Sequence, residues 1–215
     1  MRWWYRLWKT LLHVWFSICF DMRLLGRENV PLDGPVLLVC NHQSFLDPPM
    51  VGMALGRECD FIARQTLFDN PVFGWFIRSV NSFPVQGEGE LATIRTIIRR
   101  LQNNRAVVLF PEGVRSPDGR IGALQKGFEV IARRGDAATV PVVIEGAYDA
   151  WPRHQRHINL RKPIHIMYGK PVSAAELKAM SRDEFLGHIT GRLQQMQARL
   201  RQQLGKAPFA YRDDD

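Results

Sequence analysis

The chain has 215 residues, of which 46% are hydrophobic, so it can bury one substantial core but is short for a second full domain. Its 29 Lys and Arg residues outnumber its 21 Asp and Glu residues, and the formal charge of +8 favours an anionic partner such as nucleic acid, a phosphorylated metabolite or a lipid headgroup. The three cysteines lie inside apolar runs, which excludes a disulfide framework or a metal site of the usual cysteine spacing and fits a reducing compartment.

The first element in the chain is an amphipathic helix, predicted for residues 1–20. This segment holds four of the six tryptophans and three cations, and no acidic residue precedes Asp21. Side chains three or four residues apart form a polar side and an apolar side. These are Arg2, Arg6, Lys9, His13 and Ser17 on the polar side, and Trp4, Trp8, Leu11, Trp15 and Ile18 on the apolar side.

This helix is too short in its apolar part to cross a membrane. Its longest uncharged run has eleven residues, whereas a bilayer-spanning helix needs roughly 20. Tryptophan rings and long cationic side chains suit the headgroup zone, so residues 1–20 are predicted to lie on the membrane surface. A helix that merely packs on a domain shows the same periodicity, and this alternative stays open. We therefore expect residues 1–21 to be an interfacial helix, 22–205 to be one domain and 206–215 to be a tail that frays.

Short apolar runs alternate with amphipathic stretches in the rest of the chain, which is typical of an α/β domain with a mixed sheet flanked by helices. Several predicted strands lack polar alternation, as strands covered on both faces do. The predicted strands are residues 35–40, 60–63, 80–85, 106–110, 139–144 and 164–168. The predicted helices are residues 49–55, 72–78, 91–103 and 128–134, followed by two that begin at Ser-x-x-Glu capping boxes at 173–176 and 181–184.

A histidine and a carboxylate follow the predicted strand at 35–40, in the sequence VLLVCNHQSFLDPP. His42 and Asp47 are five residues apart, so they lie about 140° apart on a regular helix and can meet only on a turn. Asp47 precedes a proline, which disfavours the helical conformation at that position. A carboxylate bound to one imidazole nitrogen leaves the other nitrogen free to take a proton from an alcohol. No Gly-x-Ser-x-Gly elbow is present, and Cys40 lies in the apolar run, so direct base catalysis is favoured.

A second polar cluster follows the predicted strand at 106–110, in the sequence VVLFPEGVRSPDGR. Glu112, Arg115 and Arg120 are placed beside Gly113 at the strand exit. One interpretation is that these polar side chains simply face water on a surface loop. Alternatively, the planar fork of arginine matches phosphate oxygens, and a glycine lets backbone N–H groups approach an anion.

These two clusters resemble the motifs of the glycerolipid acyltransferases, the family of 1-acylglycerol-3-phosphate (lysophosphatidate) acyltransferases. NHQSFLD at 41–47 resembles their NHxxxxD motif, and FPEGVRS at 110–116 resembles FPEGTRS. Weaker similarities lie between and after them, at residues 61–74, 124–127 and 140–142. The resemblance runs from about residue 26 to residue 172 and implies a glycerol-3-phosphate acyltransferase-like fold.

The resemblance also implies a role for each matched residue. His42 is the general base on the acceptor hydroxyl, and Asp47 orients it. The acyl donor is a thioester of CoA or of acyl carrier protein, with no other cofactor and no covalent acyl-enzyme. The six histidines are dispersed along the chain, so no metal site is expected either. The residues implied to bind the glycerol phosphate are Glu112, Gly113 and Arg115, with Arg64 and Lys126 as further basic positions.

Two positions depart from the family pattern. Where the family commonly has F-P-V-D-R, this chain has Phe83-Pro84-Val85 followed by Gln86-Gly87, so the expected arginine is absent. Val114 replaces the threonine of FPEGTRS and removes one hydroxyl. Either another cation such as Arg78 or Lys126 binds the phosphate, or the acceptor is a different lysolipid.

The predicted function is therefore the transfer of an acyl chain to the free hydroxyl of lysophosphatidate, giving phosphatidate in phospholipid biosynthesis. The predicted location is the cytoplasmic face of a membrane, with monotopic attachment. The alternatives are an acyltransferase for another lysolipid, alcohol or amine, and a non-catalytic protein that binds anionic lipids. Nucleic acid is not expected as a partner, because aromatic residues concentrate in the N-terminal segment and do not interleave with basic strands.

Overall fold

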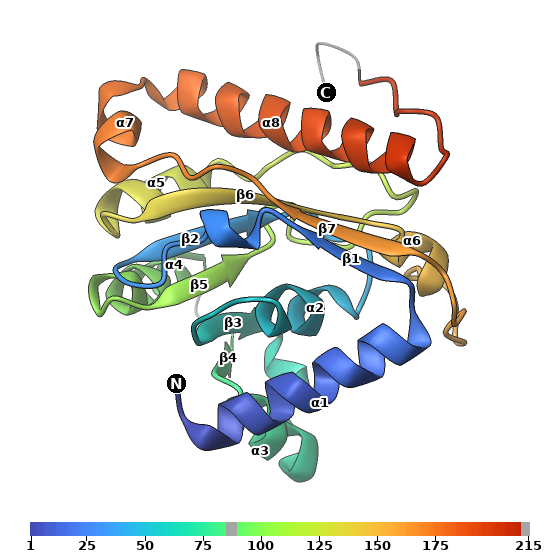
Figure 1. Ribbon diagram of the computed structural model, residues 1–215. Helices are drawn as coiled ribbons and strands as arrows, with labels where there is room; N and C mark the ends of the chain where they lie inside the picture. Colours follow the sequence, from blue (N-terminus) through green and yellow to red (C-terminus); the bar gives the residue numbers. More distant parts are fainter. Residues whose placement is uncertain (85–89, 212–215) are drawn as a thin grey trace.

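A single seven-stranded sheet organises the chain in the computed structural model, which describes residues 1–84 and 90–211 (Figure 1). The strand order is β1-β7-β6-β2-β5-β3-β4, and all neighbouring pairs are parallel except β6 and β7. The predicted α/β class with a mixed sheet is confirmed. The strands are β1 (Met22–Leu25), β2 (Val36–Cys40), β3 (Cys59–Ala63), β4 (Ser82–Pro84), β5 (Ala106–Leu109), β6 (Ala138–Glu145) and β7 (Ile164–Tyr168).

Helices cover both faces of this sheet. Figure 1 shows α8 and α7 along one side of the sheet and α1, α2 and α3 along the other. The α-helices are α1 (Trp3–Cys19), α2 (Asp47–Met53), α3 (Pro71–Ser79), α4 (Glu90–Gln102), α5 (Gly127–Arg134), α6 (Ala147–Ala150), α7 (Ala174–Ala179) and α8 (Arg182–Gln203). Two short 3-10 helices are η1 (Arg27–Asn29) and η2 (Gln65–Phe68). Both predicted capping boxes are present, at Ser173 with Glu176 and at Ser181 with Glu184.

Strand β2 shows why apolar and polar residues do not alternate along the central strands. Its side chains point alternately to the two faces. Val36, Leu38 and Cys40 enter the core beneath α1 and α2, whereas Leu37 and Val39 enter the core beneath α4, α5, α7 and α8. All five are fully buried, because each face of the central strand is covered by helices.

The structure differs from the predicted elements at three places. Strand β1 was not predicted, because its four residues alternate too briefly to stand out and it pairs only with β7 at the sheet edge. The four-residue helix α6 was also missed. Helix α2 begins at Asp47 and not at Pro49, so both prolines lie in its first turn. Backbone N–H groups in the first turn of a helix have no partner within the helix, so a proline there loses no hydrogen bond.

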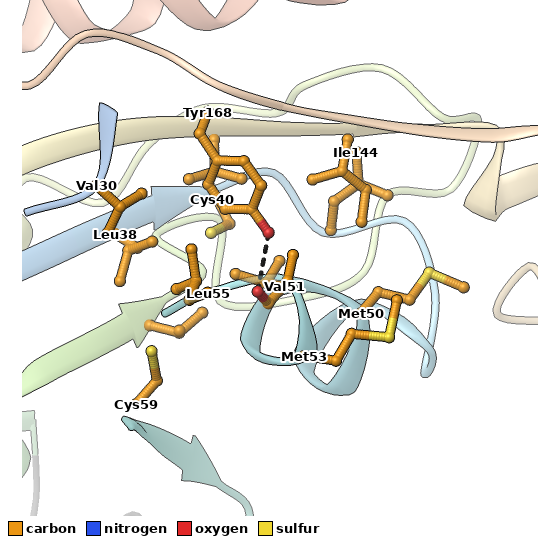
Figure 2. Packing of buried hydrophobic residues seen from close by; sticks show 14 of the residues in the cluster. Val30, Leu38, Cys40, Met50, Val51, Met53, Leu55, Cys59, Ile144 and Tyr168 are labelled. Atoms are coloured by element: carbon orange, nitrogen blue, oxygen red, sulfur yellow. Dashed lines mark hydrogen bonds between the residues drawn. The ribbon is translucent and has the colours of Figure 1, made fainter. Parts of the chain in front are cut away.

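A buried tyrosine fixes α2 against the sheet. The Tyr168 hydroxyl, at the end of β7, donates a hydrogen bond of 2.8 Å to the Val51 carbonyl of α2 (Figure 2). Cys40 and Cys59 lie in the same core and are fully buried, and burial raises the pKa of both thiols. Cys40 is therefore a packing residue, as the sequence predicts, and not a nucleophile.

The N-terminal helix packs on the domain along one side only. Tyr5 and Phe16 are buried, and the Tyr5 hydroxyl accepts a hydrogen bond from the Cys59 N–H. Lys9, which the helical period places on the polar side, is partly buried and bonds through its amine to the Leu55 carbonyl. A row of large apolar side chains stays exposed on the helix, namely Trp3, Leu7, Leu11, Val14, Trp15 and Ile18. No helix within residues 1–84 or 90–211 is long and apolar enough to cross a membrane.

Candidate active site

His42, in the turn after β2, meets Asp47, the first residue of α2. The Nδ1 atom of His42 lies 2.8 Å from Oδ2 of Asp47, whose side chain is fully buried. The same oxygen accepts the backbone N–H groups of Gln43 at 2.6 Å and Ser44 at 2.7 Å. Three donors thus converge on one carboxylate oxygen and fix its position. Because Nδ1 is occupied, Nε2 is the ring nitrogen left for a substrate.

Two neighbours hold this turn on the sheet. The Asn41 amide exchanges hydrogen bonds with the backbone of Ile144 in β6, accepting from its N–H at 2.8 Å and donating to its carbonyl at 3.0 Å. The His42 ring stacks on Phe110, with 4.3 Å between ring centroids. The sequence placed Phe110 in the second motif but gave no sign that it would touch the histidine.

The Glu112 carboxylate points inward and joins the two motifs. One oxygen accepts the backbone N–H of His42 at 2.8 Å, and the other accepts the N–H of Gly122 at 3.1 Å. Burial raises the pKa of this carboxyl from 4.5 to about 7, against the lowering effect of the two backbone hydrogen bonds. Glu112, predicted to bind the glycerol phosphate, is thus placed to position the backbone of His42, the predicted general base.

Gly113 occupies a position that favours glycine. Its φ angle of +72° lies in the left-handed region, and a Cβ atom there would overlap the Gln125 amide. The turn carries the chain from Glu112 to Arg115 along the cavity wall.

Arg115 places a cation on the same cavity as His42, which with Asp47 forms a His–Asp dyad. Its guanidinium carbon lies 3.4 Å from the ring centroid of Phe45, and its buried Nη1 has no hydrogen-bond partner in the part of the chain that the structure describes. Its pKa is lowered by burial, then by the neighbouring charges of Arg153 and Arg64. A buried donor without a partner costs free energy, so this group is suited to an anionic ligand.

Of the other two basic residues predicted to bind the phosphate, one lines the cavity and the other does not. Arg64 is exposed and lines the same cavity as His42 and Arg115. Lys126 is exposed but does not line that cavity, and neither does Arg78. The predicted departure at Val85, Gln86 and Gly87 lies outside the described residues. Arg153 was not singled out from the sequence, because nothing local shows that its loop approaches Arg115.

A largely apolar cavity of about 1170 Å³ opens beside the dyad. Its wall is assembled from the sheet, from the two motif loops and from several helices. The helix residues that line the cavity are Tyr5, Lys9 and Leu12 of α1, Pro48, Pro49, Gly52 and Met53 of α2, Phe73, Phe76 and Ile77 of α3, Thr93, Ile94 and Ile97 of α4, and Gly127, Phe128 and Ile131 of α5. Within residues 1–84 and 90–211, no three His, Cys, Asp or Glu side chains come together to hold a metal ion.

The segment that carries these features matches a known family model, described as Acyltransferase, over residues 21–145. The chain belongs to the acyltransferase family. The resemblance seen in the two motifs is thereby confirmed at the level of the family. The match ends at Glu145, so helix α8 and the C-terminal segment lie beyond it.

Individual relatives of this acyltransferase cover most of the chain. A chloroplastic 1-acyl-sn-glycerol-3-phosphate acyltransferase of Arabidopsis thaliana is 29% identical over 76% of this chain and 48% of its own length. The chain thus spans about half the length of that plant enzyme. A 1-acyl-sn-glycerol-3-phosphate acyltransferase of Bacillus subtilis is 26% identical over 89% of this chain and 94% of its own.

A solved structure supports the fold. The crystal structure of the 1-acyl-sn-glycerophosphate (LPA) acyltransferase of Thermotoga maritima is similar, with a TM-score of 0.76 and 26% identity. The similarity covers 91% of this chain and 79% of that protein.

Proposed function

We propose that this protein transfers an acyl chain from a thioester to the free hydroxyl of lysophosphatidate and so makes phosphatidate. The observation that carries the proposal is one shared cavity lined by His42, by Arg115 and by largely apolar side chains. The buried Nη1 of Arg115 has no hydrogen-bond partner within residues 1–84 and 90–211. The hydroxyl, the phosphate and the acyl chain of such a reaction each need one of these surroundings. The names of the Arabidopsis and Bacillus relatives support the same acceptor.

The chemistry follows from the dyad. The acceptor hydroxyl donates its proton to Nε2 of His42 while its oxygen attacks the thioester carbonyl carbon. The carbon–sulfur bond then breaks, and the leaving thiolate takes the proton from the imidazolium. Asp47 holds the ring tautomer and stabilises the imidazolium, so His42 returns to its starting state without a covalent acyl-enzyme.

Binding of the acceptor phosphate is assigned to Arg115, with Arg64 at the same cavity. Stacking on Phe45 holds the guanidinium plane, and a phosphate would supply the partner that Nη1 lacks. Because Lys126 and Arg78 do not line the cavity, a lysolipid whose phosphate carries a headgroup is the second candidate acceptor.

Attachment to a membrane surface is assigned to α1 together with α3. Trp4 of α1 contacts Trp75 of α3, with 5.8 Å between ring centroids, so the two helices form one surface. Val72 and Trp75 are 76% and 60% exposed and add apolar surface on α3. The same two helices wall the cavity, so an acyl chain could pass from bilayer to active site without crossing water. We expect Trp75→Asp to weaken sedimentation with phosphatidylglycerol vesicles, whereas Leu160→Asp, at an exposed site on neither helix, should not.

The central experiment measures thiol release by the purified protein. Acyl-CoA and acyl-acyl carrier protein are each offered with lysophosphatidate and with lysolipids that lack a free phosphate monoester. Release that requires lysophosphatidate and is lost in His42→Ala is the expected result. Release with another lysolipid alone would keep the mechanism and change the acceptor, and no release across the panel would favour a lipid-binding role.

A further inference from the structure

A buried amide inside the first motif faces away from the cavity. Gln43 is fully buried and follows His42 directly. Its side-chain nitrogen donates to the Gly119 carbonyl at 2.8 Å and to Oε2 of Glu145 at 3.1 Å. Its side-chain oxygen accepts the Tyr148 N–H at 3.2 Å. The base on the substrate is thus joined by one peptide bond to a polar network that the proposed chemistry does not use.

A second buried amide reaches the same two acceptors from helix α8. Gln197 is fully buried, and its side-chain nitrogen donates to the Gly119 carbonyl at 2.8 Å and to Oε2 of Glu145 at 2.9 Å. Arg201 of the same helix places a guanidinium nitrogen 2.8 Å from the other oxygen of Glu145, which balances the buried charge. Both amides therefore fix the start of the loop 119–122.

The C-terminal segment fixes the end of that loop. The Tyr211 hydroxyl accepts the Ile121 N–H at 3.0 Å and donates to the side-chain oxygen of Gln197. The next residue, Gly122, donates its N–H to Glu112, whose other oxygen holds the N–H of His42. The loop is thus held between Tyr211 on one side and the catalytic turn on the other.

Residues 206–211, expected to be part of a fraying tail, pack back on the domain to deliver this tyrosine. Gly205 has a φ angle of +70° and ends α8 with a reversal of the chain. The Phe209 ring lies 3.6 Å from the guanidinium carbon of Arg201 and 5.3 Å from that of Arg120. Arg201 also donates to the Ala207 carbonyl at 2.7 Å.

We propose that Tyr211 and Gln197 are positioning residues of the acyl-transfer centre, which hold the loop 119–122 so that Glu112 and Gln43 fix the backbone of His42. The inference rests on the proposed function. It assigns a role in the reaction to a segment that lies outside the family match at residues 21–145.

The test compares two tyrosine hydroxyls that bond to neighbouring parts of one loop. Tyr211→Phe removes the hydroxyl that binds Ile121, and Tyr148→Phe removes the hydroxyl that donates to the Pro117 carbonyl at 2.7 Å. We expect Tyr211→Phe to lower kcat about tenfold or more, because misplacement of a catalytic group by about 1 Å costs on the order of 100-fold. KM for both substrates should stay within about twofold, since no group that binds substrate is altered. Tyr148→Phe should keep the wild-type kcat, because Tyr148 binds Gln43 through its backbone N–H, which the substitution leaves in place.

A second variant shows whether the two residues act as one unit. Gln197→Met keeps the length of the side chain and removes its hydrogen bonds. The double variant with Tyr211→Phe should lose no more than the worse single variant, because residues of one network are not additive. Thermal unfolding of each variant gives the folded fraction, to which kcat is normalised.

The outcomes separate the two hypotheses. A wild-type kcat in folded Tyr211→Phe and Gln197→Met, with only a lower unfolding midpoint, would overturn the positioning role and leave the proposed function intact. If the wild-type protein itself transfers no acyl group to any acceptor, the proposed function fails instead.

Discussion

Glu112 offers a test of how burial governs this site, through the pH dependence of stability. Its pKa is raised from 4.5 to about 7 because the carboxyl is buried. The folded state therefore binds this proton more tightly than the unfolded state does. The resulting contribution to stability is fully present below about pH 4.5 and is lost as the pH rises through about 7.

The magnitude follows from the size of that shift. Each unit of pKa corresponds to about 1.4 kcal/mol, so the free energy of unfolding should lose roughly 3 kcal/mol through this group between pH 4.5 and pH 8. Glu112→Gln cannot titrate. The difference in unfolding free energy between wild type and Glu112→Gln should therefore shift by about that amount, against the wild type, as the pH rises.

Denaturant unfolding at several pH values between 4.5 and 8 measures this difference. Contributions from groups that do not interact with Glu112 are the same in both proteins and cancel. Glu28→Gln, a change at an exposed site on η1, controls for the change in side-chain chemistry. A difference between wild type and Glu112→Gln that stays constant with pH would refute the argument from burial.

Three further changes probe the site and its support. Asp47→Asn should lower kcat by a factor of about 100 to 10,000 at similar KM, because the imidazole loses its fixed tautomer, and thiol-release kinetics would show it. Gly113→Ala should lower the free energy of unfolding by about 1–3 kcal/mol, since φ is +72° and the new Cβ would overlap Gln125. Adding Gln125→Ala to Gly113→Ala should restore the part of the lost stability that comes from overlap with Gln125, and the part that remains comes from backbone strain. If Gly113→Ala alone is as stable as the wild type, both causes are refuted. Tyr168→Phe should cost about 1–3 kcal/mol in denaturant unfolding, because a buried carbonyl of α2 loses its partner; a cost near zero would mean that another donor replaces the hydroxyl.

The sequence by itself determined the features that depend on neighbouring residues. Uninterrupted apolar runs predict buried strands such as β2, and Ser-x-x-Glu spacing predicts the start of α7 and α8. The five-residue step from His42 to Asp47, with a proline after it, predicts a turn, because these constraints act along the backbone. The two motifs also indicate the family, because each is a continuous run of residues that can be read from the sequence.

Only the tertiary structure decided which distant groups meet. The hydrogen bond between Asn41 and Ile144 joins residues 103 apart in sequence, and the sequence around either residue does not predict it. Glu112 turns to backbone N–H groups, and Lys126 lies outside the cavity, although both match family positions for substrate binding. Tyr211 reaches the loop 119–122 only because Gly205 reverses the chain after α8. Such convergence depends on how the elements pack, and the packing depends on buried surface summed over the whole fold and not on any short stretch of sequence.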